Sequence, residues 1–179
     1  MRVLHLAILL SCALPSAAFA AAPKQLYGKS ITVSWLETRS QRDSQAGPTF
    51  KPVGIPFSNI FYISSAGRVF MRTSARSPGG AGSNDKVGAS GSNAEGGARE
   101  VTFSGNRIVS TTASQGGAGR QVSITFDPSL SSCTAQVITG MPPGKKSVVV
   151  KSITTGNTVE FESVSAGPAS CSIASGNPF

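Results

Sequence analysis

The stretch FYISSAGRVFMR, residues 61–72, predicts a β-hairpin. Two apolar runs flank Ser65–Gly67, whose composition suits a three-residue loop: a type I turn followed by a glycine in the left-handed conformation. Because side chains alternate between the two faces of a strand, this loop sets which residues share a face. One face is wholly apolar and is expected to line the core; it carries Phe61, Ile63, Val69 and Met71.

The opposite face of this hairpin combines aromatic rings with positive charge. Tyr62 faces Phe70 in the predicted register, and Arg68 and Arg72 flank the pair. One interpretation is a ligand-binding surface. The two rings would stack on an apolar or ring-bearing ligand, and the two arginines would pair with its anionic groups. The alternative is that the segment 40–58 covers the rings, while the arginine side chains lie over them in cation–π contacts.

Alternation with a period of two dominates the rest of the chain, as in Ile31–Trp35, Val122–Phe126 and Val159–Phe161. Half-buried strands of this kind predict an all-β fold, an antiparallel meander of about ten strands that forms a barrel or a sandwich. The predicted strands lie near residues 29–38, 59–64, 68–74, 99–104, 107–114, 120–126, 132–139, 147–155, 158–165 and 169–174.

Turn residues divide these strands. SGNR at 104–107 and TGNT at 155–158 each predict a two-residue hairpin loop in which positive φ is allowed at both central positions. In the second hairpin this register sets Lys151 opposite Glu162, an opposite-charge pair. The proline-containing segment 40–58 and the Gly/Ser-rich segment 77–98 are predicted to be flexible loops.

The first twenty residues are predicted to be a signal peptide rather than part of the fold. Arg2 precedes the short apolar run Leu4–Leu14, and Ala18–Ala20 forms a small-x-small cleavage signal. A second interpretation is a lipoprotein signal in which Cys12 is the lipidated residue. The apolar run is too short for a transmembrane helix. We therefore expect a single β domain over residues 21–179, located in the periplasm or secreted.

Two cysteines, Cys133 and Cys171, follow the predicted signal peptide. In an exported chain, two thiols predict one disulfide bond. A metal-binding or redox-active pair is disfavoured because the CxxC spacing is absent and the only histidine, His5, lies in the signal peptide. No metal or other cofactor is expected.

The sequence argues against catalysis. Without a histidine after residue 5, neither a Ser-His-Asp triad nor a histidine-rich metal site can form in the exported chain. Glu160 and Glu162 share one strand face at a separation that could suit a pair of glycosidase acids. Their place beside a tight hairpin instead points them toward solvent. We predict no catalytic residue and no enzymatic activity.

The formal net charge of +8 permits attraction to anionic polymers, lipid headgroups or nucleic acid, or serves only to keep the protein soluble. Lys145-Lys146 is the longest run of like charge, so no specific nucleic-acid partner is expected. The predicted function is a binding domain for an apolar or anionic small molecule. The alternative is a structural, envelope-associated protein that contacts anionic cell-surface polymers.

Four stretches resemble a group of small, uncharacterised exported bacterial proteins with two cysteines. They are GKSITVSW at 28–35, FYISSAGRVFMR at 61–72, FDPSLSSCTAQV at 126–137 and ASCSIASGN at 169–177. The resemblance implies export and a β domain with two cysteines, and it implies no activity and no site.

If the predicted cleavage occurs, the protein recovered from the periplasm or the medium has the denatured mass of a chain that begins at Ala21. Mass spectrometry under denaturing conditions measures this directly. A mass that fits a lipid-modified chain beginning at Cys12 would contradict the prediction and support the lipoprotein interpretation.

Overall fold

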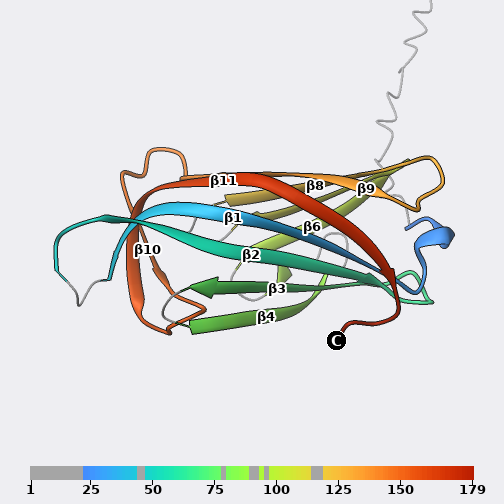
Figure 1. Ribbon diagram of the computed structural model, residues 1–179, viewed down its shortest axis with the longest axis horizontal. Coiled ribbons are helices and arrows are strands. Elements are labelled where there is room, and N and C mark those ends of the chain that lie inside the picture. Colours follow the sequence, from blue (N-terminus) through green and yellow to red (C-terminus); the bar gives the residue numbers. More distant parts are fainter. Residues whose placement is uncertain (1–21, 44–46, 78–79, 89–92, 95–96, 114–118) are drawn as a thin grey trace, which may run out of the picture.

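Antiparallel strands make up nearly all of the structure, a computed structural model that describes residues 22–43, 47–77, 80–88, 93–94, 97–113 and 119–179 (Figure 1). The all-β prediction is confirmed, and the predicted signal peptide lies outside the described residues. The elements are a 3₁₀ turn η1 (Lys24–Leu26) and strands β1 (Lys29–Asp43), β2 (Lys51–Ile63), β3 (Val69–Ser77), β4 (Gly80–Gly88), β5 (Asn93–Ala94), β6 (Gly97–Ser104), β7 (Arg107–Ala113), β8 (Gly119–Phe126), β9 (Cys133–Gly140), β10 (Val148–Lys151) and β11 (Thr158–Ser175).

The strands form two sheets. The first has the order β10-β11-β1-β2-β3-β4, and the second has the order β5-β6-β7-β8-β9. The long strand β11 runs across the molecule, pairs with β1 and lies beside β9 of the second sheet (Figure 1). The predicted disulfide is present: Cys133 of β9 and Cys171 of β11 are joined, with their Cα atoms 5.6 Å apart. It therefore links the two sheets covalently.

Side chains from the inner faces of both sheets form one core, which is the expected result of period-two alternation. The largest fully buried apolar side chains are Phe61, Phe161, Leu26, Ile31, Ile63, Met71, Ile108 and Ile124. Leu26 comes from η1 and packs into this core with the strand residues. The opposite residues of β1, β2 and β3 face outward and form the exposed surface discussed below.

The hairpin at residues 61–72 has the predicted geometry. Phe61 pairs with Met71 and Tyr62 pairs with Phe70, so the predicted register is confirmed. Gly67 has φ +76° and donates its N–H to the Ser64 carbonyl, which closes the three-residue loop. The predicted core face is also confirmed, because all four of its apolar side chains are buried.

The prediction of a loop over 40–58 is wrong. Strand β1 continues to Asp43 and β2 begins at Lys51, so most of this segment is paired strand. Pro52 and Pro56 are tolerated because β2 pairs with β3 only from Phe57 onward. The two prolines therefore lie where β2 has a neighbour on one side, and their missing N–H groups interrupt no second ladder.

The prediction of a flexible loop over 77–98 is also wrong where the structure describes it, since β4 pairs with β3 along its whole length. Backbone hydrogen bonds form a strand here although few of its residues are apolar. The glycines have a steric role as well. A Cβ atom at Gly82 would lie 1.7 Å from the Ile153 carbonyl oxygen, so only glycine allows the segment before β11 to pack against β4.

The predicted register of the hairpin at 155–158 is wrong. Lys151 pairs with Thr158 rather than Glu162, and a loop of six residues, 152–157, separates the strands. The Ser152 side chain explains the longer loop, because its Oγ accepts hydrogen bonds from the backbone N–H groups of Thr154 and Thr155. The hairpin at 104–107 is confirmed, although only Gly105, with φ +56°, uses a positive φ.

The two strands predicted at 158–165 and 169–174 are one strand, β11. Trp35 pairs with Ala169 and Glu37 with Ala166, so β11 has one extra residue opposite Leu36. Pro168 lies in this bulge, where a strand can continue without one backbone donor. Within the described residues, no helix is long and apolar enough to cross a membrane.

Replacing both bridging cysteines, as in Cys133→Ser/Cys171→Ser, should lower the free energy of unfolding. The bond closes a loop with a sequence separation of 38 residues. The disulfide restricts the unfolded chain over this loop, and the resulting stabilisation of the folded state is at most about 4 kcal/mol. Urea unfolding of the wild type, of the variant and of the reduced wild type measures the effect. Equal midpoints for the oxidised wild type and the variant would contradict it.

Candidate functional site

Three of the four predicted ligand-binding residues, Tyr62, Phe70 and Arg72, lie on the outer face of β2 and β3, and Arg68 lies in the loop just before β3. The ring centroids of Tyr62 and Phe70 are 6.2 Å apart in a tilted arrangement. The Arg68 guanidinium carbon lies 5.8 Å from the Phe70 centroid, and its side chain is exposed. Arg72 pairs with Ile60 on the neighbouring strand and completes the group. We call these residues, together with Phe179, the arginine–aromatic cluster.

Phe179 is the member that the sequence pattern did not identify. Its ring meets Tyr62 edge to face, with centroids 6.4 Å apart, and the Arg72 guanidinium carbon lies 4.6 Å from its centroid. The ring stays 42% exposed. The alternative interpretation is wrong about segment 40–58, because 51–58 continues the strand that carries Tyr62. Its cation–π contact is present between Arg68 and Phe70. A residue 117 positions away in the sequence partly covers the cluster instead.

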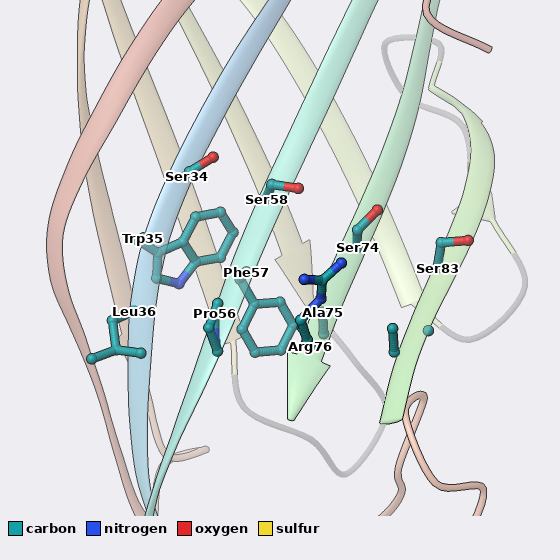
Figure 2. Close-up of a pocket in the computed structure, with 12 residues that line it drawn as sticks. Ser34, Trp35, Leu36, Pro56, Phe57, Ser58, Ser74, Ala75, Arg76 and Ser83 are labelled. Atoms are coloured by element: carbon teal, nitrogen blue, oxygen red, sulfur yellow. The ribbon is translucent and has the colours of Figure 1, made fainter. Parts of the chain in front are cut away.

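A trough of about 910 Å³ lies on the same outer face, across β1, β2, β3 and β4 (Figure 2). The alternation of the strands explains its lining, because Ser34, Ser58 and Ser74 occupy outward positions between buried neighbours. The complete lining is Ser34, Trp35, Leu36, Pro56, Phe57, Ser58, Ser74, Ala75, Arg76, Ala81, Gly82 and Ser83. We call this feature the hydroxyl trough.

Four serines cross the trough in register, one from each strand (Figure 2). Ser34 pairs with Ser58, Ser58 with Ser74, and Ser74 with Ser83. Neighbouring strands are ~4.8 Å apart, so the row spans ~14 Å. No hydrogen bond joins these four hydroxyls to another group in the described part of the chain, whereas Ser40, farther along β1, donates to Glu162. The row therefore offers open donors and acceptors.

One end of the trough combines an apolar surface with a positive charge. Leu36 is 50% exposed and pairs with Pro56 across β1 and β2. Arg76 is exposed, and it is the only charged residue among the lining residues. Within the described residues, no acidic side chain forms a salt bridge with Arg76.

A buried ion cluster, formed by Glu37 and Arg39 of β1 with Arg120 of β8, lies between the two sheets. The Glu37 carboxylate has no exposed surface and accepts hydrogen bonds from Arg39 Nε at 2.7 Å and from Arg120 Nε at 2.7 Å. Arg120 Nη2 donates at 2.9 Å to Glu37 Oε1, the oxygen that also accepts the hydrogen bond from Arg39. Arg120 comes from β8, so the ion cluster connects the two sheets.

The local charges determine the ionisation of this cluster. Burial alone raises the pKa of Glu37, but the hydrogen bonds and positive charges of Arg120 and Arg39 outweigh it and hold the pKa below its ordinary value. Burial is also the largest effect on Arg39, and it lowers the pKa of that guanidinium. One carboxylate opposes two guanidinium groups, so the cluster carries a net positive charge.

Aromatic rings connect the ion cluster to the floor of the trough. The Arg120 guanidinium carbon lies 4.2 Å from the Phe57 centroid, and Phe57 stacks on Trp35 with centroids 5.5 Å apart. In Figure 2 these two rings lie side by side beneath the row of serines. Trp35 and Phe57 are the chain neighbours of Ser34 and Ser58. The ion cluster therefore stabilises the strands that present the hydroxyls, and its members are positioning residues.

The two glutamates considered as catalytic acids have other partners. Glu160 forms an ion pair with Arg42 at 2.6 Å, and Glu162 accepts a hydrogen bond from Ser40. Hydrogen bonding by Ser147 and Arg42 holds the pKa of Glu160 below its ordinary value. A general acid needs a raised pKa near neutral pH, which is the opposite shift. In the described ranges, no group of three or more His, Cys, Asp or Glu side chains is arranged to hold a metal ion.

Comparisons with protein-family models, with curated proteins and with solved structures found no match. Part of the site could have been found by sequence analysis. The alternation that turns Ile31, Val33 and Trp35 inward also turns Glu37 inward, which marks a buried charge that needs a partner.

Replacing Glu37 should strongly destabilise the fold. Glu37→Gln leaves two largely buried guanidinium groups without a counter-charge, and breaking a buried pair in this way costs about 3–5 kcal/mol. The pKa of Glu37 is lower in the folded than in the unfolded chain. Its stabilisation is therefore complete above the ordinary value of 4.5 and is lost as pH falls toward the folded-state pKa.

Urea unfolding between pH 3 and pH 7 tests both points. At the upper limit the stabilisation by ionised Glu37 is complete, and below 4.5 it is lost progressively as the carboxylate is protonated. Glu37→Gln should remove part of the acid-induced loss of stability, and the exposed Glu162→Gln is the matched control. If Glu37→Gln lowered the free energy of unfolding as little as the control does, the ion cluster would not stabilise the fold as predicted.

Proposed function

We propose that this chain is an exported, non-catalytic binding domain, periplasmic or secreted, that holds an apolar or anionic small molecule at the arginine–aromatic cluster. The binding residues are Tyr62, Arg68, Phe70 and Arg72. The observation that carries the proposal is the position of the Phe179 ring. This ring already meets Tyr62 edge to face and lies beneath the guanidinium of Arg72. A ligand with a flat ring would find the same contacts.

The exposure and charge of the cluster support an anionic group on that ligand. Arg68 is exposed and can donate paired hydrogen bonds to a carboxylate or sulfonate. Cation–π contacts with the rings keep the guanidinium groups close to the stacking surface. Phe179 is partly exposed, so exchanging its ring for a ligand ring would uncover little apolar surface.

Titration calorimetry with 2-naphthalenesulfonate, a flat ring with one sulfonate, tests the proposal. Arg68→Gln/Arg72→Gln should weaken binding by about tenfold or more, because both charged donors to the sulfonate are lost. The melting temperature should change little, since surface substitutions of this kind have small effects on stability.

The matched control is Lys145→Gln/Lys146→Gln, which removes the same charge from an exposed loop far along the chain. It should leave binding of the sulfonate unchanged. Equal weakening by both double variants would show that net charge rather than the cluster binds the probe. A large loss of melting temperature in the arginine variant without an effect on binding would also count against the site.

A second candidate is a structural, envelope-associated protein that contacts anionic cell-surface polymers. It is favoured by the exposed lysines at positions 24, 51, 145, 146 and 151. Such binding would fall steeply with added salt, because exposed charges are screened. Binding of poly-glutamate would then weaken similarly in the lysine and arginine double variants, in contrast to the behaviour expected of the sulfonate.

A further inference from the structure

We infer that the hydroxyl trough is a second binding site, and that it takes a linear polysaccharide with carboxylated sugars whose chain crosses β1, β2, β3 and β4. The inference goes beyond the proposed function, because the trough and the arginine–aromatic cluster share no residue. It depends on the serine row, the apolar end of the trough and Arg76. Together these features disfavour a purely apolar ligand and a compact small molecule.

The serine row favours a hydroxylated ligand. Each hydroxyl can donate one hydrogen bond and accept two, which matches the mixed donor and acceptor character of sugar hydroxyls. These four hydroxyls make no hydrogen bond within the described chain, so a ligand displaces only solvent from them. An apolar ligand would bury the hydroxyls without partners, which is unfavourable.

The geometry of the row favours an extended chain. The four serines are in register on adjacent strands, so the hydroxyls recur at ~4.8 Å, the separation of neighbouring strands. This interval is close to the length of one sugar in an extended, β-linked polysaccharide. A chain laid across the strands would therefore meet one hydroxyl per sugar, whereas a compact small molecule would reach only part of the row.

The remaining lining residues suit sugar rings with an acidic group. The exposed Leu36 side chain and Pro56 form an apolar platform on which the C–H face of a pyranose ring can pack. Arg76 is the charged residue of the lining and can bind a sugar carboxylate through two parallel hydrogen bonds. None of the described residues that line the trough is acidic, so none of them would repel such a ligand.

The test is titration calorimetry with an alginate hexamer, a linear oligomer with one carboxylate per sugar, and with cellohexaose as the neutral counterpart. The trough variant is Ser34→Ala/Ser58→Ala/Ser74→Ala, which removes three hydroxyls without changing charge. The matched control is Thr111→Ala/Thr125→Ala/Thr134→Ala, which removes three hydroxyls from exposed positions of the second sheet. Arg76→Gln tests the carboxylate contact.

The wild type and the threonine control should bind the alginate hexamer with equal affinity. The trough variant should bind it about tenfold or more weakly, as expected for the loss of several hydrogen bonds. Arg76→Gln should remove the preference for the alginate hexamer over cellohexaose. Unchanged melting temperatures would show that the variants are folded.

Three results would overturn the inference: no binding of alginate by the wild type, equal losses in the trough and threonine variants, or a dimer that only the trough variant abolishes. Binding of 2-naphthalenesulfonate separates the two proposals, because the trough variant should leave it unchanged. If the protein binds 2-naphthalenesulfonate but not the alginate hexamer, the trough is rejected as a site and the arginine–aromatic cluster is retained. If it binds the hexamer but not the sulfonate, the cluster is rejected and the trough is retained.

Discussion

The buried carboxylate of Glu37 is the constraint on which the rest of the arrangement depends. A charge without any exposed surface is tolerated only with close counter-charges, and here they come from its own strand and from β8 of the other sheet. This requirement links β1 of the first sheet to β8 of the second. The disulfide between Cys133 and Cys171 joins them a second time, through β9 and β11. The sheets are thus joined by an electrostatic and a covalent link, each between a different pair of strands.

Strand β1 turns this internal constraint into an external surface. Its inward residues carry the core and the ion cluster, and its outward residues carry part of the hydroxyl trough, because alternate side chains leave opposite faces. Trp35 and Phe57 lie directly inside Ser34 and Ser58, so packing of the rings against Arg120 bears on the position of the hydroxyls. The Glu37→Gln substitution would therefore disturb both faces of one strand.

The outer face combines two kinds of recognition chemistry. The arginine–aromatic cluster offers stacking and positive charge, and the trough offers hydroxyls on a regular spacing with one arginine at its end. The two proposed sites use these two chemistries separately, because they share no residue. The glutamates nearest to a pair of catalytic acids are engaged by Arg42 and Ser40, which leaves them suited to holding β1 and β11 together.

The sequence by itself determined the features that depend on neighbouring residues. Alternation predicted the strands, and Ser65–Gly67 predicted the register that places Tyr62 beside Phe70, because a short loop leaves few ways to pair the strands it joins. The tertiary structure alone decided what comes from distant segments. Arg120 reaches Glu37 across 83 positions, Phe179 reaches Tyr62 across 117, and Ile153 packs on Gly82. Such contacts depend on how the sheets fold over one another, and no local pattern encodes that. The serine row also depends on the tertiary structure. No local pattern distinguishes any of the four serines, and only the pairing of four strands aligns them.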